Sequence, residues 1–354
     1  MKRRFAFTVL IGFCLASLAP VIPGLGFGCA GKLSAQDAGA GVADPPVGTV
    51  DNGSTTTELD GRVVEDVDTQ DAGQAVVAAE NGPGDKPVKE KKDQEYVRLA
   101  KDKKGRDRAM QTAIVRFEGL PGTPYEGRIV DLFGVVHIGQ DEYYADINQR
   151  LSTYDAVLYE LVAPDGTRIR PEDLEKSRSA LAQLQTGMKR MLNLEYQLEK
   201  VDYMAENFVH ADMSPDEFMQ DMKKRGDSLP KMFARMMGAS MATSVSSGGD
   251  AGMLMALFSN DRSKQLKRVM SRQLMDIDAA TAGMQDAEGN DTLIKGRNEK
   301  AFSVLKQELD AGKKSLSVFY GAGHLPDMAE RLKKDFQMKP IETTWLDAWD
   351  LTRN

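Results

Sequence analysis

The stretch Ile129-Val-Asp-Leu-Phe-Gly-Val-Val-His137 decides the fold class that this sequence predicts. Its nearly continuous apolar character is typical of a strand that is buried on both faces of a sheet. A helix follows, with acidic residues at its start from Asp141, and the run from Asp155 to Val162 has the same buried-strand pattern. This part of the chain therefore predicts a strand, helix, strand unit.

Helix and strand patterns on either side continue the theme. Apolar residues alternate from Thr112 to Gly119, which predicts a strand. Nearer the C-terminus the pattern predicts a helix at Glu299–Leu309, a strand at Ser315–Tyr320, a helix at Asp327–Lys334 and a strand at Ile341–Trp345. We therefore predict an α/β fold, with a mixed central sheet flanked by helices.

Methionine marks the segment between these two α/β halves. Of the 19 methionines, 15 lie between Met188 and Met284, and the pattern from about 171 to 284 is helical. We predict a helical insertion there. Methionine fills irregular cores, so packing is one interpretation, and an adaptable groove for a peptide or another apolar ligand is the other.

The N-terminus has the form of a secretory signal. Basic residues at positions 2–4 precede the apolar stretch Phe5–Ala19, and small residues favour cleavage before Gln36. Residues 1–35 are thus predicted to be a signal peptide of a secreted or periplasmic protein. Lipid attachment at Cys29, or another membrane association through this N-terminal segment, is the less favoured alternative.

Composition excludes several classes of function. Both cysteines, Cys14 and Cys29, lie in the predicted leader, so the mature chain has no thiol for a disulfide, a zinc ribbon or a cysteine nucleophile. The net charge of −7 argues against nucleic acid as a partner. Residues 36–108 are predicted to be a disordered spacer followed by a charged linker, which leaves residues 110–354 as the folded domain.

Two of the three histidines end the same short pattern, Gly134-Val-Val-His137 and Gly321-Ala-Gly-His324. His137, Glu160 and His324 each lie at or near the carboxyl end of a predicted strand, and ligands of open α/β sheets bind beyond these ends. Two imidazoles and a carboxylate can hold a catalytic divalent metal ion such as Mn, Co or Zn. The glycines of the motifs offer backbone amides that could face an oxyanion.

Two further residues are candidates for this site. Arg297, just before a predicted helix, could hold a substrate carboxylate or stabilise charge in the transition state, or could form a surface salt bridge. His210 lies before a new helix that starts near Ser214, and is either a structural histidine or a further ligand.

Four short motifs in order resemble the TraB/PrgY/GumN family, which includes the Tiki proteins. They are Phe133-Gly-Val-Val-His-Ile-Gly139, Val157-Leu-Tyr-Glu-Leu161, Gly296-Arg-Asn298 and Val318-Phe-Tyr-Gly-Ala-Gly-His-Leu325, spread over about 129–324. The resemblance implies a mixed sheet flanked by helices, akin to erythromycin esterase and ChaN proteins. Tiki proteins are described as metal-dependent proteases, whereas other members inhibit peptide pheromone signalling. Pro326-Asp327 departs from the family, which often has a glycine there.

These observations predict a metal-dependent hydrolase, a peptidase acting on peptide or protein substrates. In a variant of this hypothesis one histidine is a general base oriented by Glu160, and no metal takes part. The alternative from another class is a non-catalytic protein of the cell envelope that binds a peptide, haem or another apolar ligand. An inactive relative that serves as an envelope scaffold is the third.

Overall fold

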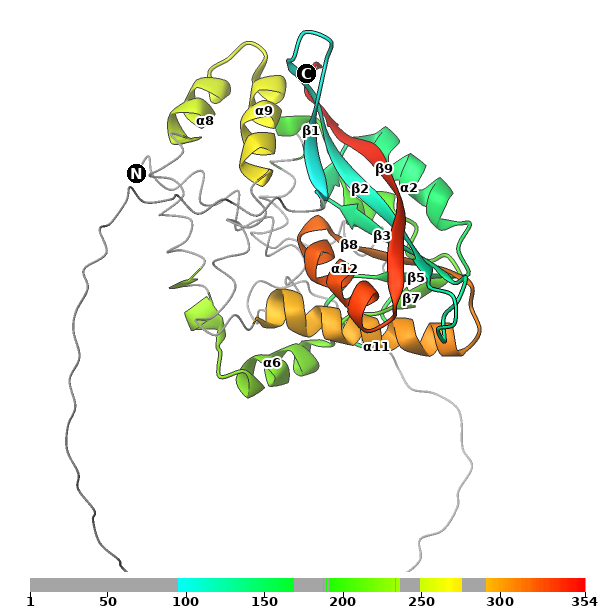
Figure 1. The fold of residues 1–354 in the computed structure, drawn as a ribbon. Coiled ribbons are helices and arrows are strands. Elements are labelled where there is room, and N and C mark those ends of the chain that lie inside the picture. Colours follow the sequence, from blue (N-terminus) through cyan, green and yellow to red (C-terminus); the bar gives the residue numbers. More distant parts are fainter. Residues whose placement is uncertain are drawn as a thin grey trace, which may run out of the picture. The chain divides into compact units, whose positions relative to one another are not determined.

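A mixed sheet with helices on both faces forms the folded part of the chain (Figure 1), as the α/β prediction requires. The structure is a computed structural model. It describes residues 95–168, 187, 189, 191–232, 234–235, 249–275 and 291–353. The predicted signal peptide, nearly all of the predicted spacer and parts of the predicted insertion lie outside the described residues.

The central sheet has seven strands. Four of them run parallel in the order β3, β8, β5, β7, and β2 pairs antiparallel with β3. β9 pairs with β2 along one of its two edges. On the other edge, β1 pairs with the first part of β2 and β3 pairs with the second part. The strands are β1 (Val97–Lys101), β2 (Asp107–Gly119), β3 (Ile129–Val135), β5 (Ala156–Tyr159), β7 (Phe208–His210), β8 (Ser315–Gly321) and β9 (Met338–Asp350).

Alternating side chains of the strands bury two apolar layers, because successive residues of a strand point to opposite faces. In β3, Val130 and Leu132 pack in the layer of α11 (Arg297–Asp310) and α12 (Leu325–Lys334). Phe133 and Val135 pack in the other layer with α2 (Asp141–Leu151). The predicted strands and helices of both α/β halves are thereby confirmed, within a few residues at their ends.

The sheet begins earlier in the chain than the sequence pattern indicates. β1 lies inside the predicted charged linker and forms a hairpin with the first part of β2. Val97 is buried, and the guanidinium of Arg98 lies 4.0 Å from the centre of the Trp345 ring. The charged residues of β1 interrupt the apolar pattern that would indicate a strand. Their aliphatic stems nevertheless cover apolar surface, while their charges stay in water.

The predicted insertion is less purely helical than expected. It supplies β7, which extends the central sheet beside β5, and β6 (Glu195–Tyr196), which pairs with β4 (Ile138–Gly139) in a small second sheet. Its described helices are α5 (Gln197–Lys200), α6 (Pro215–Lys224), α8 (Gly249–Leu257) and α9 (Arg262–Leu274). β6 and β7 span only two and three residues, which is too short for a period-2 signal to stand out.

None of the helices in the described ranges is both long enough and apolar enough to span a lipid bilayer.

Candidate functional site

Four polar side chains gather where the parallel strands end. His137 follows β3, Glu160 follows β5, Asp212 follows β7 and His324 follows β8. The register aligns these ends, because Val135 pairs with Gly321, and Tyr159 pairs with both Phe319 and His210. The residues predicted from the sequence therefore lie at one edge of the sheet.

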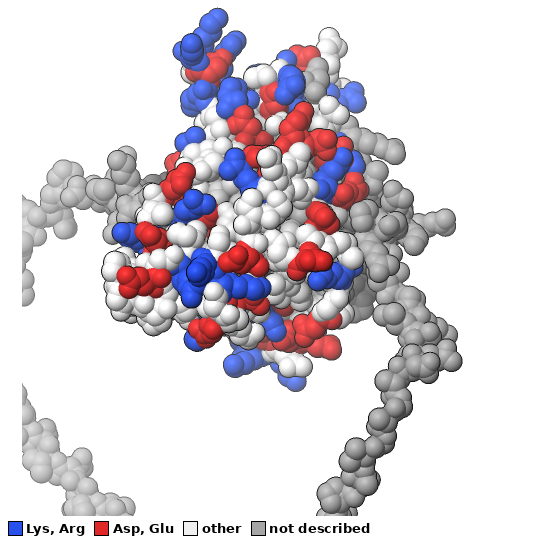
Figure 2. Space-filling view, turned by 90° about the vertical axis from the view of Figure 1, so that its right-hand side faces the viewer, with Lys and Arg blue, Asp and Glu red and all other residues white. Residues whose placement is uncertain are grey.

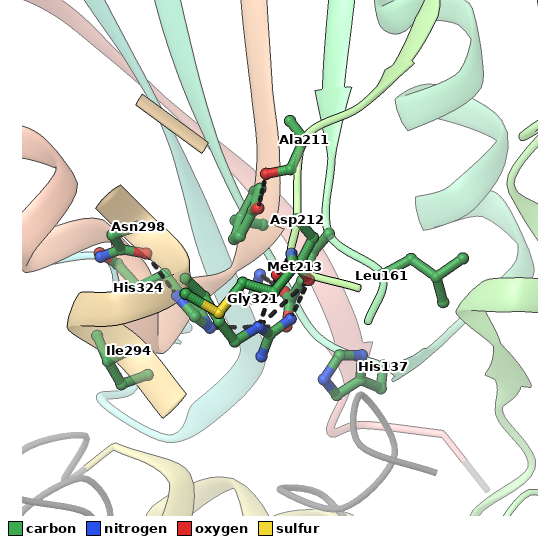
Figure 3. Close-up of polar contacts among 12 residues, drawn as sticks. His137, Leu161, Ala211, Asp212, Met213, Ile294, Asn298, Gly321 and His324 are labelled. Carbon is green, nitrogen blue, oxygen red and sulfur yellow. Dashed lines mark hydrogen bonds and ion pairs between the residues drawn. The ribbon is translucent and has the colours of Figure 1, made fainter. Parts of the chain in front are cut away.

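Arg297 forms ion pairs with two carboxylates of this cluster, those of Glu160 and Asp212, and Figure 3 labels Asp212. The Nε atom of Arg297 donates to Oδ1 of Asp212 over 2.9 Å, and Nη2 donates to Oε1 of Glu160 over 2.8 Å. Arg297, Glu160 and Asp212 are exposed by only 2%, 7% and 0%. The alternative of a surface salt bridge for Arg297 is therefore wrong, because this ion cluster is buried.

Asp212 is a member of the site that sequence reasoning did not select. It sits two residues after a strand too short to be recognised, in a segment that the sequence presents as a junction before a helix. A carboxylate that follows an apolar pair of residues, Phe208 and Val209, is the one signal that the chain offered.

A π-helix, η3 (Thr292–Gly296), leads directly into Arg297. Such turns are rare and recur at functional sites. Asp291 caps it, since its Oδ1 accepts from the backbone nitrogens of Ile294 and Lys295. The other oxygen of Asp291, Oδ2, is buried and has no hydrogen-bond partner among the described residues. Asp291 thus places an unsatisfied acceptor at the start of the turn that positions Arg297.

In this cluster two carboxylates share one guanidinium. Burial alone would raise the pKa of Glu160, but the charge of Arg297, with help from His324, holds that pKa well below its usual value. Glu160 also accepts from the backbone nitrogen of Gly321 over 2.7 Å. It is therefore an ionised carboxylate at neutral pH.

His324 is fixed on its Nδ1 side. Asn298 donates through Nδ2 to the backbone oxygen of His324 and to Asp327, so its Oδ1 is the atom that faces Nδ1 of His324, 2.7 Å away. Nδ1 must then be the donor, and in the neutral ring Nε2 carries the lone pair. That Nε2 lies 3.6 Å from Oε1 of Glu160.

His137 has a similar but looser arrangement. Its Nδ1 lies 3.2 Å from Oε1 of Gln197, whose Nε2 donates to the hydroxyl of Tyr203. The ring lies beside the ion cluster (Figure 3). Burial lowers the pKa of His137, and the opposing charge of Glu160 does not overcome this effect. His137 is therefore a neutral imidazole at neutral pH.

One of the motif glycine amides is already engaged, and another motif glycine serves packing. The amide of Gly321 already donates to Glu160. Gly134 serves close packing, since a Cβ there would lie 2.9 Å from the side chain of Leu325. The interpretation of Gly321 as an oxyanion donor is thus wrong, because Glu160 occupies its amide.

His210 lies away from the cluster. Its Nε2 is 2.6 Å from the backbone oxygen of Leu161, and its Nδ1 is 3.8 Å from a carboxylate oxygen of Asp165. Its ring also contacts Tyr159. These contacts favour the structural interpretation of His210.

The donor set fits a divalent cation in its chemistry, although the described residues contain no ready-formed group of three or more His, Asp and Glu ligands. Two ligands of one ion lie about 3–4 Å apart, and Glu160 and His324 meet this condition at 3.6 Å. Asn298 holds the outer nitrogen of His324 as second-shell groups do in metal sites. Two carboxylates that share a single guanidinium also favour a cation.

No family model, no curated protein and no solved structure matches this chain. The resemblance to the TraB/PrgY/GumN family stays a prediction.

Proposed function

We propose that this chain is a secreted or periplasmic metal-dependent hydrolase that cleaves peptides. Its site would consist of His137, Glu160, Arg297 and His324. The observation that carries the proposal is the orientation of the two motif histidines, since each turns Nδ1 to a carboxamide oxygen, so that Nε2 is the nitrogen that would bind a metal ion.

His137, Glu160 and His324 would hold the cation, such as Mn, Co or Zn. When bound, a divalent ion lowers the pKa of a coordinated water to about 7 and polarises the scissile carbonyl group. The chain itself supplies orientation. Asn298 orients the ring of His324 through Nδ1, and Arg297 keeps Glu160 ionised.

Arg297 has a double role in this proposal. Its Nε and Nη2 atoms bind the two carboxylates, whereas Nη1 takes part in none of these contacts. Nη1 is then the nitrogen that would donate to a substrate oxygen. A guanidinium fixed by two acids costs little ordering entropy when it does so.

A second candidate is a hydrolase that needs no metal. The closeness of His324 to Glu160 favours it, because a carboxylate 3.6 Å from Nε2 stabilises the imidazolium that forms when the ring takes a proton from water. His324 would be the general base, and His137 would not be required for the proton transfer.

The rival binding function rests on the methionine-rich segment. Met213, Met222 and Met232 are buried in one small apolar cluster, and Met253 and Met270 belong to the main core. These five residues favour the packing interpretation. Met188, Met236, Met237, Met241 and Met284 lie outside the described residues.

One experiment distinguishes the metal-dependent hydrolase, the metal-free hydrolase and the binding protein. Metal content and cleavage of a synthetic peptide mixture, followed by mass spectrometry, would be measured for the purified protein, for a His137→Ala/His324→Ala variant and for the control His210→Ala. We expect about one metal ion per chain, with both metal and cleavage lost in the double variant and kept in the control. Cleavage that survives a chelator supports the metal-free mechanism. Peptide or haem binding without cleavage, equal in all three proteins, would sink both hydrolase proposals.

A further inference from the structure

A cleft of about 480 Å³ lies outside the proposed active site, between the β1–β2 hairpin and α9. Its lining comprises Leu99, Lys101, Gly105, Arg106, Asp107, Arg268 and Arg272. Its volume falls in the range of about 300–1,000 Å³ that is typical of small-molecule sites. Four of the seven lining residues are basic, and one is acidic.

This local charge is opposite to that of the whole protein. The chain has 46 basic and 53 acidic residues, so a random surface cleft would carry a slight acidic excess. In Figure 2, blue side chains gather at the end of the molecule where the hairpin projects in Figure 1, whereas blue and red alternate over the rest of the face shown. Lys103 and Lys104, in the hairpin turn, add two exposed positive charges next to the cleft.

The acidic side chains near the cleft do not neutralise it. Asp107 is shared between Arg272, at 2.8 Å, and Lys101, at 3.6 Å. Arg268 donates through Nε to the backbone oxygen of Leu351, and no carboxylate pairs with it among the described residues. A surplus of positive charge therefore remains even after Asp102 is counted against Arg106.

The cations are held in place before any ligand arrives. Asp102 accepts from the backbone nitrogens of Lys104 and Arg106, and it also binds the guanidinium of Arg106. Gly105, with a φ of 75°, closes this turn. α9 fixes Arg268 and Arg272 one helical turn apart, on the same side of the helix. Preorganisation of this kind lowers the ordering cost of binding.

We propose that this cleft binds a ligand with a phosphate group, either a soluble phosphate compound or the head group of an anionic lipid. Arg268, Arg272, Arg106 and Lys101 would supply the donors, because guanidinium groups match the oxygens of a phosphate in pairs. Leu99 and the Cα of Gly105 give the cleft an apolar wall for the part of the ligand that carries the phosphate. The site does not depend on the proposed hydrolase function.

Calorimetric titration of the purified protein with inorganic pyrophosphate tests this site. We expect a Kd of about 1 mM or tighter in low salt, and weaker binding as salt is added. Arg268→Gln/Arg272→Gln should weaken binding at least about tenfold, whereas Lys306→Gln/Lys333→Gln, which removes two distant surface charges, should leave it within about twofold. Arg106 is 69% exposed in its side chain, so Arg106→Gln provides a variant with little risk to folding.

A second arm identifies the source of the phosphate. Vesicles of phosphatidylcholine with and without phosphatidylglycerol would be sedimented with the protein. Retention by the anionic vesicles that pyrophosphate competes away and Arg268→Gln/Arg272→Gln abolishes assigns a lipid head group; pyrophosphate binding without vesicle retention assigns a soluble ligand. No pyrophosphate binding by the unaltered protein, or equal weakening in the distant control, would overturn the proposal.

Discussion

The two Gly-x-x-His motifs look alike in the sequence and differ in the folded protein. His324 is 5% exposed, bonded to Asn298 and close to Glu160, and α12 starts directly after it. His137 is only partly buried, bonded to Gln197, and followed by the two-residue strand β4. The motif therefore determines which side chain lies at the carboxyl end of a strand. Residues from elsewhere in the chain determine the burial and the hydrogen-bond partners of that side chain.

Among these variants, removal of Arg297 should change stability most, because Arg297 neutralises Glu160, the carboxylate beside His324. Arg297→Met leaves Glu160 and Asp212 buried without a counter-charge, so we expect a loss of about 3–5 kcal/mol in the free energy of unfolding. Arg108→Gln breaks a bidentate ion pair with Asp347 that is exposed to solvent. This variant should lower the free energy of unfolding by about 1 kcal/mol or less. Denaturant titration measures both. Equal losses in the two variants would contradict a buried ion cluster.

Single histidine variants test whether His137 and His324 have the same role. If both rings are ligands, His137→Ala and His324→Ala should each lower kcat/KM for peptide cleavage by about 10²–10⁴-fold. Their stabilities should differ, since His324→Ala leaves the buried Oδ1 of Asn298 without its donor, at a cost of about 1–3 kcal/mol. Steady-state kinetics and thermal unfolding of the same samples check this. Full activity in His137→Ala would leave His324 and Glu160 as the working pair.

The first glycines of the two motifs provide the next test. A Cβ at Gly134 would lie 2.9 Å from Leu325 and 3.2 Å from the backbone oxygen of Ala113, so Gly134→Ala should cost about 1–3 kcal/mol of stability. At Gly321 the nearest atom is Oε2 of Glu160, at 3.2 Å, and the amide that binds it remains. Gly321→Ala should therefore fold with a loss of less than about 1 kcal/mol and lower activity about tenfold. A larger stability loss at Gly321 than at Gly134 would reverse the comparison.

The smallest expected effect is the pH dependence contributed by His137. Its pKa is lowered in the folded state, so between about 6.5 and the folded pKa the unfolded chain binds a proton that the folded chain refuses. This contribution to stability is present above about pH 6.5 and is lost as pH falls, by at most about 1.4 kcal/mol per pH unit. Unfolding free energies from pH 7.5 to 5 should fall less steeply for His137→Gln than for the unaltered protein. Identical slopes would show that His137 titrates alike in both states.

Much of the fold could be predicted because the strong local signals are long. β3 and β8 are nearly continuous apolar runs of seven residues, α2 and α11 are longer helices with helical periodicity, and all four were predicted. β1, β6 and β7 were not, because their pairing is set by partners far away in the chain rather than by their own pattern.

The residues of the candidate site likewise fall into those that the sequence predicts and those that it does not. His137, Glu160 and His324 could be placed at one edge, since a strand that reaches a given edge delivers the residue that follows it. Asp212, Gln197 and Asp291 could not be assigned, because a polar residue in a loop or at the start of a helix gives no local sign of the group that it contacts in the fold.

The amino-acid sequence alone was sufficient to predict an α/β fold with a mixed sheet flanked by helices, and the end of the sheet where the motif residues lie, because apolar patterning and chain direction are local properties. Only the tertiary structure decided that Arg297 is shared by two carboxylates, that the two histidines differ in burial, and that a hairpin and a helix enclose a basic cleft. These features depend on distances between residues more than 80 positions apart in the chain, and burial and charge pairing act through such distances rather than through sequence spacing.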